Sequence, residues 1–553
     1  MTHATHRDSR ISFSDISLGA RFLCKLPTFL RRPLSREEAN AIQRRRLERL
    51  EVDFLALVKQ TIYEDPASPY RQLLNLVGCE YGDLERLVSQ GGVEGALRTL
   101  FLRGVYLTVD EFKGRRPVVR GRATIAVDPS HLRNPWSAFH VPVRSSGSRG
   151  PGNEFSIDLA FVREHAANMN LVLNACGGLD WLHGIWGLPG GAAVLQLLRY
   201  SAAGCPPTRW FSQVDPATPT LHPRYRWSGQ ALHWGGVVAG VRLPRPLFVP
   251  IEDPLPIAHW MAEVLRSGHT PHLHTFASSV VRLCQAALGA GVDLQGARFT
   301  IGGEPVTEAR LNAVRRVGAE ALLQYASIES GGTIGSGCLA PEAPDDVHLF
   351  DDLHALIQPN QDGEIPGLPA SALFISSLRP TAPFILLNVS MGDQAVMTRR
   401  ACGCPLERLG WATHLHTIRS YEKLTSAGMT LLDTDAIRVL EEVLPARFGG
   451  APIDYQLLED EADDGQPRLR LLVDPAVGPL DPTRVADAFL TAIGTGTGRE
   501  RLRELLWRDA GLLRVERLAP RTTASGKILH LHLERTSQAR QVSRALSPDH
   551  PRL

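Results

Sequence analysis

A run of small and hydroxyl-bearing residues could bind phosphate. It reads Ser145-Ser146-Gly147-Ser148-Arg149-Gly150-Pro151-Gly152. Glycine lets backbone N–H groups approach phosphate oxygens closely, and the hydroxyls can donate further hydrogen bonds. The run lacks the Gly-Lys-Ser/Thr of a P-loop. A phosphate-binding loop and a flexible surface loop are both compatible with this pattern.

Two further segments combine turns with residues that could contact a nucleotide. The turn Gly302-Gly303-Glu304-Pro305 follows a predicted strand at 297–301, and its glycines would allow close approach to a flat ligand or to a neighbouring strand. A plain strand-ending turn is the alternative. In the segment 324–332, Tyr325 could stack on a base, and Glu329 could hold Mg²⁺ beside phosphates. A buried tyrosine and an exposed glutamate would look the same.

Three charged residues nearer the C-terminus extend the pattern. Asp393 follows an apolar run at 384–387 and could accept hydrogen bonds from both ribose hydroxyls, while Arg419 could assist it or contact phosphate. Lys527 ends a Ser-Gly-Lys turn within 520–527. Lysine supplies only five of the 60 basic residues (25, 59, 113, 423 and 527), so arginine serves wherever a solvated charge suffices. The ammonium of Lys527 is therefore a candidate for phosphate contact.

Taken in order, these five segments resemble the core motifs of the adenylate-forming superfamily, which comprises acyl-CoA synthetases, luciferases and peptide-synthetase adenylation domains. The resemblance covers roughly residues 70–530. It is greatest to the phenylacetate–CoA ligase branch, which includes the acyl-protein synthetases. Three features favour that branch: the helical N-terminal region, a phosphate loop without its usual final lysine, and Cys402-x-Cys404 just after Asp393.

The resemblance implies a role for each segment. Ser145, Ser146, Gly147, Ser148 and Gly150 would wrap the ATP phosphates, and the turn Gly302–Pro305 would line the adenine and acyl sites. Tyr325 would stack near adenine, Glu329 would bind Mg²⁺, and Asp393 would hold the ribose with support from Arg419. Lys527 would bridge the carboxylate and the α-phosphate. The stretch 419–428 would be the hinge of a rotating C-terminal domain.

The chain also departs from the family pattern. Arg149 stands where threonine is usual, and Asn153 where many relatives have lysine. Ser420-Tyr421-Glu422 replaces the usual hinge aspartate pair, and the lysine loop is one residue longer than in the common pattern. Hinge and lysine loop govern the domain rotation. These departures therefore bear more on the second half-reaction than on adenylation.

Four side chains form a candidate zinc site. Cys402 and Cys404 invite a search for two more ligands, and Cys338 and His348 flank a nearby Pro-Glu-Ala-Pro-Asp-Asp loop. Three thiolates and one imidazole suit a closed, structural Zn²⁺ site, and similar sets occur in the branch named above. Four unrelated side chains are the alternative.

The acyl pocket is expected around residues 272–279. His274 and Phe276 lie there, at the start of a predicted helix at 278–288. A histidine could recognise a polar acid, although lone histidines are more often satisfied core residues.

The elements that must position these residues alternate along the chain. Helical spacing is clear from Ser35 onward and at 69–88, 93–102, 155–174, 257–265, 434–444, 482–493 and 498–509, and strands are expected at 297–301, 372–375, 454–458 and 469–473. Such alternation favours α/β layers with largely parallel sheets. We expect an α/β fold with a large N-terminal multi-sheet adenylation domain and a small mobile α+β C-terminal domain.

The expected boundaries follow from these patterns. Residues 1–35 are a loosely ordered lead-in, and 36–415 form the N-terminal domain, with a helical region at 36–110 and an α/β core at 111–415. Residues 416–540 form the C-terminal lid, followed by a tail at 541–553.

Composition limits the function classes. The net charge of +2 gives no electrostatic reason to expect nucleic acid or an anionic membrane as a partner. There is no run of about 18 apolar residues and no apolar signal-peptide core. Eight cysteines in 553 residues do not make a disulfide scaffold. A cytoplasmic location is expected by default, and a homodimer is left open.

The predicted function is ATP-dependent activation of a small carboxylic acid to an acyl-adenylate with pyrophosphate release, followed by transfer to coenzyme A. ATP, Mg²⁺, a structural Zn²⁺ and coenzyme A are the expected cofactors and co-substrates. Two alternatives remain. One is transfer to the thiol of an acceptor protein, as in acyl-protein synthetases, or to a small-molecule amine. The other is an inactive nucleotide-binding scaffold.

Overall fold

The computed structural model describes residues 13–137, 140–144, 154–215, 218, 223–327, 329–359, 368–421, 425–426, 429–430, 434–461, 467–494, 513–523 and 526–533. The chain divides into two compact units. The first consists of residues 1–145 and 152–419, and the second of residues 146–151 and 420–553. The domain boundaries expected from the sequence stay a prediction.

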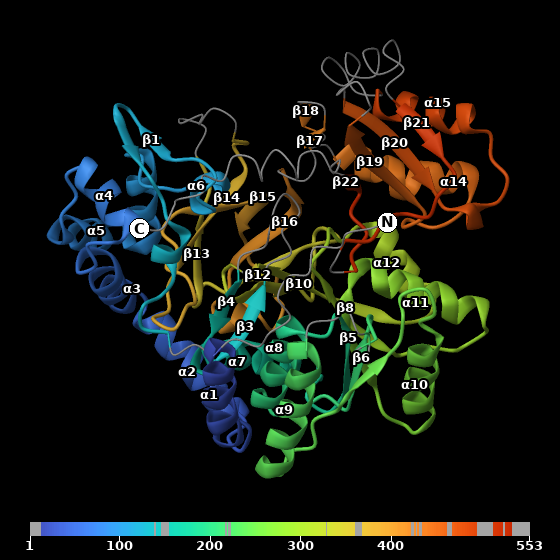
Figure 1. The fold of residues 1–553 in the computed structure, drawn as a ribbon, viewed down its shortest axis with the longest axis horizontal. Helices are drawn as coiled ribbons and strands as arrows, with labels where there is room; N and C mark the ends of the chain where they lie inside the picture. The colour runs from blue at the N-terminus through green and yellow to red at the C-terminus, as the bar shows by residue number, and fades with distance from the viewer. Residues whose placement is uncertain are drawn as a thin grey trace, which may run out of the picture. The chain divides into compact units, whose positions relative to one another are not determined.

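A mixed sheet is the centre of the first unit (Figure 1). Its parallel half contains, in spatial order, β7 (Pro246–Phe248), β6 (Arg209–Ser212), β5 (Leu182–Gly187), β8 (Pro271–Phe276), β9 (Arg298–Gly302) and β10 (Glu320–Ser327). The sheet continues through β11 (Gly332–Gly337), β12 (Val347–Leu349), β16 (Thr413–Ser420), β15 (Val389–Arg399), β14 (Ala372–Ser377) and β13 (His354–Ile357). These strands pair antiparallel wherever a register is defined. The α/β class is confirmed, but the expected largely parallel sheet is only half right.

Helices cover both sides of the parallel strands. Helices α10 (Leu255–Arg266) and α11 (Ala277–Gly289) pack against β8, and α8 (Gly191–Ala202) packs against β5. Figure 1 shows these two groups on opposite sides of the strands. Helix α12 (Glu308–Arg315) contacts β10, and α7 (Leu159–Ala175) contacts β11. Because strands covered on both faces are shielded from solvent, β5 and β8 are buried along most of their length.

The N-terminal helical region contains α2 (Arg36–Glu48), α3 (Leu50–Val58), a π-helical turn (Lys59–Tyr63), α4 (Pro69–Leu76), α5 (Tyr81–Leu102) and α6 (Val109–Phe112). Ser35 caps α2, and its backbone N–H donates in return to Glu38, which completes a capping box. The helix expected at 69–88 is in fact two helices, because Gly78 adopts a left-handed conformation (φ 62°) between them. The remaining elements of this unit are two hairpins, β1 (Val118–Arg120) with β2 (Ala123–Ile125) and β3 (Val141–Arg144) with β4 (Glu154–Ile157), together with short 3₁₀ turns at Pro129–Leu132 and Glu407–Leu409.

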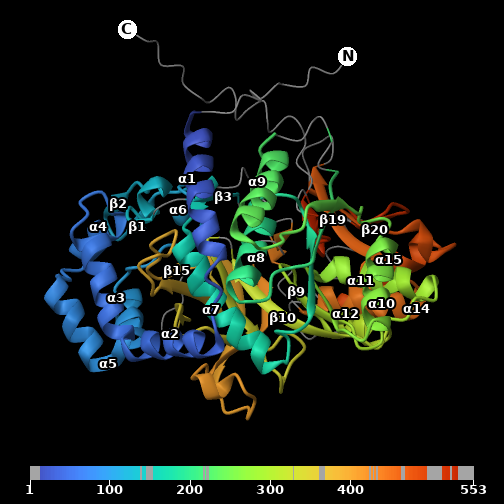
Figure 2. The same cartoon turned by 90° about the horizontal axis from the view of Figure 1, so that it is seen from below.

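The lead-in expected at 1–35 is wrong where the structure describes it. Helix α1 (Phe13–Leu30) packs beside α9 (Pro223–Ala239), as Figure 2 shows. Phe22, Leu26 and Leu30 are four residues apart and form one buried face. A side chain at Gly235 of α9 would collide with Leu26, so glycine permits this contact. Among the described residues, no helix is both long and apolar enough to cross a bilayer.

The helix expected at 155–174 begins later. Residues 154–157 form β4, and Asp158 caps α7 by accepting a hydrogen bond from the N–H of Ala160. The predicted start at residue 155 is wrong, because the apolar residues before Asp158 happen to continue the helical spacing although they belong to a strand.

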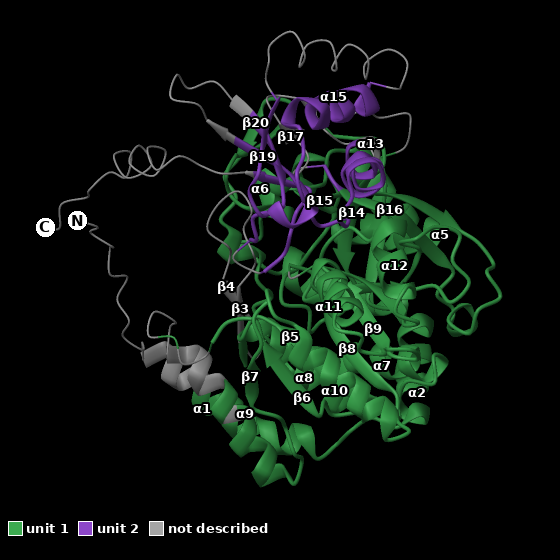
Figure 3. Ribbon diagram, turned by 90° about the vertical axis from the view of Figure 1, so that its right-hand side faces the viewer, with its two compact units in different colours: residues 1–145, 152–419 green, residues 146–151, 420–553 purple. Residues whose placement is uncertain are grey.

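The second unit is built on a four-stranded sheet, coloured purple in Figure 3. Its order is β21 (Leu513–Glu516), β20 (Pro467–Val473), β19 (Tyr455–Glu461) and β22 (Leu531–Leu533). Its core packs β19 and β20 against α13 (Thr434–Arg438), a π-helical turn (Val439–Val443), α14 (Leu444–Phe448) and α15 (Pro482–Ile493). A short 3₁₀ turn (Pro475–Val477) and the pair β17 (Thr425–Ser426) and β18 (Met429–Thr430) complete the described elements. The helix expected at 498–509 lies outside the described residues.

Candidate functional site

Three of the predicted site segments lie at the same edge of the sheet. Phe276 of β8 pairs with Gly302 of β9, which in turn pairs with Gln324 of β10, the residue before Tyr325. The three strands are parallel, so their carboxyl ends lie side by side. Ligands of open α/β sheets bind in the crevice outside such ends. The predicted acyl segment and two predicted nucleotide segments are therefore neighbours.

Tyr325 and Asp393 meet directly. The phenol of Tyr325 donates a hydrogen bond of 3.0 Å to Oδ2 of Asp393, and both residues are half-buried. They are the residues predicted to stack on adenine and to hold the ribose. The structure thus brings together two groups that are 68 residues apart in the chain.

Glu329 follows Tyr325 on the same segment. Its Oε2 accepts a hydrogen bond of 3.1 Å from the hydroxyl of Ser327, and its Oε1 lies 4.0 Å from the ammonium of Lys113, just after α6. The sequence analysis did not place Lys113 in the site. The rarity of lysine in this chain was the one signal that could have indicated it.

The Gly302–Pro305 turn is shaped by close packing of backbone. A side chain at Gly302 would collide with the carbonyl oxygen of Gln324, and Gly303 is left-handed (φ 76°). The carboxylate of Glu304 is fully buried. It accepts hydrogen bonds from the backbone N–H (2.6 Å) and the hydroxyl (2.8 Å) of Ser278, and from Nη1 of Arg310 (3.3 Å). Glu304 therefore holds the first turn of α11, and its predicted contact with nucleotide stays a prediction.

Arg419 is buried at the end of the first unit. Its Nη1 donates to Oδ2 of Asp345 over 2.8 Å. The same carboxylate accepts the backbone N–H groups of Thr417 (2.7 Å) and Ile418 (2.8 Å), where Thr417 has a positive φ of 54°. Asp345 thus organises the strand end that carries Arg419. The predicted roles of Arg419 toward ribose and phosphate stay predictions.

The predicted phosphate loop lies outside the described residues. This includes Ser145, Ser146, Gly147, Ser148 and Gly150.

Lys527 belongs to the second unit. The loop that carries it is closed by hydrogen bonds from Thr523 N–H to Lys527 O (2.8 Å) and from Lys527 N–H to the Thr523 hydroxyl (3.1 Å), while Gly526 is left-handed (φ 77°). The side-chain amide of Gln456, on β19, bonds both backbone groups of Arg521 and the carbonyl of Leu529. The described residues on either side of 524–525 are therefore hydrogen-bonded to each other and to the sheet.

The four predicted zinc ligands come together in space. Nε2 of His348 lies 3.2 Å from the sulfur of Cys404 and 3.6 Å from that of Cys402. Ligand atoms of Cys338, His348, Cys402 and His414 all lie within 4.8 Å of one another. His414 is thus a fifth candidate donor that the sequence analysis missed. Only the pairing of β12 with β16, which sets His348 opposite His414, brings it there.

Both histidines are oriented as metal ligands are. Nδ1 of His348 donates to the carbonyl of Trp411 (2.6 Å), and Nδ1 of His414 donates to Asp346 (2.8 Å). Each Nε2 therefore keeps its lone pair, as a ligating imidazole with such a support requires. Nε2 of His414 is buried and has no hydrogen-bond partner among the described residues. This orphaned acceptor and the adjacent thiols fit a Zn²⁺ ion.

The predicted acyl residue His274 lies beside other buried rings. Its Nδ1 is 3.3 Å from the hydroxyl of Tyr200, and burial, aided by Arg199, lowers the pKa of His274 to about 3. Nδ1 of His272 is 2.9 Å from Nδ1 of His183, and its Nε2 is 2.8 Å from the Thr300 hydroxyl. His272 is thus a satisfied core residue, and His274 is neutral at pH 7. Their roles toward an acid stay predictions.

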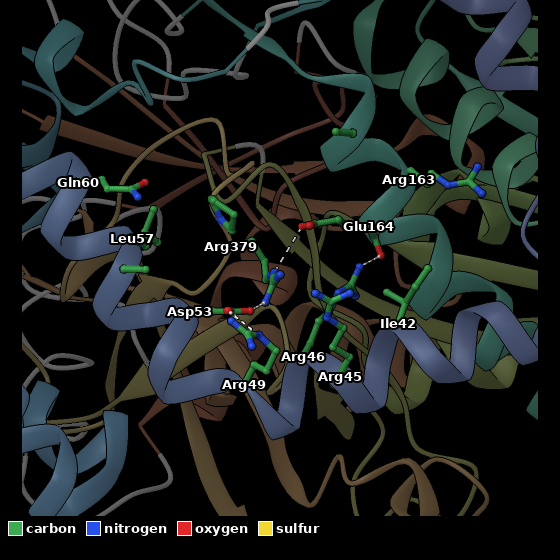
Figure 4. A pocket seen from close by; sticks show the side chains of 13 residues that line it. Ile42, Arg45, Arg46, Arg49, Asp53, Leu57, Gln60, Arg163, Glu164 and Arg379 are labelled. Carbon is green, nitrogen blue, oxygen red and sulfur yellow. Dashed lines mark hydrogen bonds and ion pairs between the residues drawn. The ribbon is translucent and has the colours of Figure 1, made fainter.

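A cavity of about 570 Å³ lies elsewhere, between α2, α3 and the start of α7 (Figure 4). Its lining is rich in arginine, but Arg379 lies between Asp53 (3.1 Å) and Glu164 (3.6 Å). Arg46 pairs with Asp352 at 3.0 Å. Most of the positive charge that lines the cavity is therefore already balanced by carboxylates of the protein. These ion pairs join the helical layer to the core, and none of the predicted site residues lines the cavity.

Comparison of the sequence with protein-family models and with curated proteins gives no match. Among solved structures, 2-hydroxyisobutyryl-CoA ligase in the postadenylation state, in complex with R3-HIB-AMP, matches with a TM-score of 0.51 and 13% identity, over 93% of this chain and 94% of that chain. Anthranilate CoA ligase AuaEII in complex with anthranoyl-AMP has a TM-score of 0.42 and 11% identity, over 86% and 80%. O-succinylbenzoate coenzyme A synthetase from Bacillus subtilis, in complex with ATP and magnesium ion, has a TM-score of 0.40 and 12% identity, over 71% and 69%.

The similarity to 2-hydroxyisobutyryl-CoA ligase establishes the fold. The chain has the fold of the adenylate-forming ligases, as its ordered motifs predicted. The narrower resemblance to the phenylacetate–CoA ligase branch stays a prediction.

Proposed function

We propose that this protein activates a carboxylic acid with ATP, forming an acyl-adenylate and pyrophosphate. One observation carries the proposal: Tyr325 and Asp393 are hydrogen-bonded, and the segment of Tyr325 begins where β8, β9 and β10 end side by side. A ring for the base, a carboxylate for the ribose and the acyl segment thus lie within one adenylate-forming fold.

In the proposed reaction an oxygen of the substrate carboxylate attacks the α-phosphorus of ATP, and the bond to pyrophosphate breaks. The protein contributes positioning and charge neutralisation, so it needs no nucleophilic side chain. Asp393 would accept the ribose hydroxyls, and Tyr325 would lie against the base. The half-buried carboxylate of Glu329 is a suitable oxygen ligand for Mg²⁺, which would neutralise phosphate charge. Lys527 would bridge the acid and the α-phosphate.

Coenzyme A is the proposed acceptor in the second step. Attack of its thiol on the acyl carbon would release AMP and form the thioester. Residues 416–540 would act as the lid that rotates between the two steps, with the hinge in 419–428. Transfer to a protein thiol or to an amine is the alternative acceptor chemistry.

The Cys/His cluster is proposed as a structural zinc site formed by Cys338, His348, Cys402 and Cys404, with His414 competing for a position. A closed site has no open coordination position for substrate. Its role would be to join the loop after β11 to the loop between β15 and β16.

Pyrophosphate exchange tests the proposal. Labelled pyrophosphate should enter ATP only when an accepted acid is present, so a broad panel of acids is screened with the full chain. Lys527→Ala should lower exchange by on the order of 100-fold, with nucleotide binding changed by no more than a few-fold. The control is Lys25→Ala, which removes an exposed ammonium on α1 and should leave exchange unchanged.

Two outcomes would contradict it. If ATP binds but no acid supports exchange, the scaffold alternative is favoured. If exchange occurs but coenzyme A does not raise AMP release, adenylation stands and the acceptor is wrong.

A further inference from the structure

Arg199 is a buried cation that no predicted role explains. It lies in α8 and is 3% exposed. Burial lowers the pKa of its guanidinium to about 10, which still leaves it positively charged at pH 7. A charge removed from water needs a counter-charge or a full set of hydrogen bonds.

The described parts of the chain supply neither to Arg199. Nη2 donates to the carbonyl of Gly331 over 2.6 Å. Nε is buried and has no hydrogen-bond partner within the described parts of the chain. Within the same residues, no carboxylate forms an ion pair with Arg199. Among the described residues, a single carbonyl therefore accepts a hydrogen bond from the Arg199 guanidinium, which can donate five.

Two other arginines are equally buried and provide an internal comparison. Arg46, 3% exposed, pairs with Asp352 at 3.0 Å, and Arg310, 1% exposed, pairs with Glu304 at 3.3 Å. Both follow the usual rule that a buried arginine has an acidic partner. Arg199 departs from that rule, so its counter-ion must come from outside the described chain.

The neighbours of Arg199 place it at the predicted acyl site. Gly331 and Gly332 end the segment that begins with Tyr325, and a side chain at Gly332 would collide with the guanidinium. The next residue, Tyr200, has its hydroxyl 3.3 Å from His274. The positive charge of Arg199 also helps to lower the pKa of His274, after burial. Arg199 thus lies between the nucleotide segment and the residue predicted to contact the acid.

We propose that Arg199 binds a second anionic group of the acid, so that the substrate class is dicarboxylic. The inference rests on the proposed adenylation function and specifies its substrate. One carboxylate reacts with ATP, and the other pairs with the guanidinium fork, which matches a carboxylate in two parallel hydrogen bonds. An acid with a neutral far end would leave the buried charge unpaired. Selectivity arises from that difference.

Matched acids test this inference in the pyrophosphate-exchange assay. Each dicarboxylic acid, such as succinate, glutarate or phthalate, is compared with its half-amide, which has nearly the same shape but no far charge. In the wild-type protein, kcat/KM should be on the order of 100-fold higher for the accepted diacid than for its half-amide. Arg199→Met should abolish that preference, and Arg199→Lys should restore part of it.

Arg46→Met is the matched control, because it also removes a buried guanidinium, but one that already pairs with Asp352. It should lower thermal stability and leave the preference unchanged. If Arg199→Met does not fold, the wild-type ratio and Arg199→Lys still decide the question.

The outcomes separate the two proposals. Exchange supported equally well by half-amides or monocarboxylic acids overturns the dicarboxylic inference and leaves adenylation standing. Equal loss of activity on charged and neutral acids in Arg199→Lys also overturns it, because that pattern indicates a structural role or contact with the reacting carboxylate. Absence of exchange with every acid contradicts the adenylation function itself.

Discussion

The hydroxyl of Tyr325 donates a 3.0 Å hydrogen bond to Asp393, although their strands are not neighbours in the sheet. Strands β11, β12 and β16 separate β10 from β15. In a flat sheet, neighbouring strands lie about 4.8 Å apart, so the four steps from β10 to β15 would separate these two strands by roughly 19 Å. The sheet must therefore bend strongly between β10 and β15. We place the nucleotide beside the two residues that this bend brings together.

This relationship predicts separable effects on nucleotide binding. Asp393→Ala should weaken ATP binding by about 10- to 100-fold, because the proposed hydrogen bonds to ribose involve a charged acceptor. Tyr325→Phe removes only the hydroxyl and should cost about 3- to 10-fold. Calorimetric titration with ATP measures both, and the double variant gives their coupling. Wild-type affinity in Asp393→Ala would contradict the ribose role.

Metal removal should destabilise the first unit. We expect about one zinc ion per chain by elemental analysis, and a lower unfolding temperature after chelation. Cys402→Ser should lose most of the metal, whereas Cys284→Ser, a buried cysteine outside the cluster, should retain it. His414→Gln shows whether the fifth donor is needed. Metal content that is equally low in the wild type and in every variant would argue against the site.

The buried carboxylate of Glu304, which holds the first turn of α11, should contribute to the stability of the fold. Glu304→Gln weakens the hydrogen bonds to Ser278 and leaves the guanidinium of Arg310 without its carboxylate. Breaking a buried pair in this way should lower the free energy of unfolding by about 3 kcal/mol. Glu308→Gln, in an exposed pair with Arg315, should cost less than about 1 kcal/mol. Denaturant unfolding compares the free energies of unfolding of the two variants. Equally small losses would show that the hydrogen bonds of Glu304 are dispensable.

Asp351 should make stability depend on pH. Burial raises the pKa of its carboxyl to about 7, against about 4 in an unfolded chain. Between these values the unfolded chain releases the proton while the folded chain retains it, so this residue makes the fold less stable as pH rises from about 4 to 7. Asp351→Asn should remove that part of the profile, unlike the exposed control Asp293→Asn. Thermal unfolding from pH 5 to 8 measures it, and parallel profiles for wild type and Asp351→Asn would refute the assignment.

Local signals were sufficient for several elements. The helix that begins after Ser35, the helix at 482–493 and the strand expected at 297–301 depend on residues a few positions apart, and the structure has an element at each place. Other elements were mispredicted because neighbours override local spacing. Helix α1 is stabilised by packing against α9, and Asp158 starts α7 after a strand that had looked helical.

By itself, the sequence determined the fold class, the order of the motifs and four thiol and imidazole groups worth testing as zinc ligands. Only the tertiary structure decided which side chains meet: Tyr325 with Asp393, His414 with the cysteine cluster, and Arg199 with Gly331 rather than with an acid. The physical reason is range. Caps and periodicity act over a few residues, whereas strand order and register set contacts between residues tens to hundreds of positions apart.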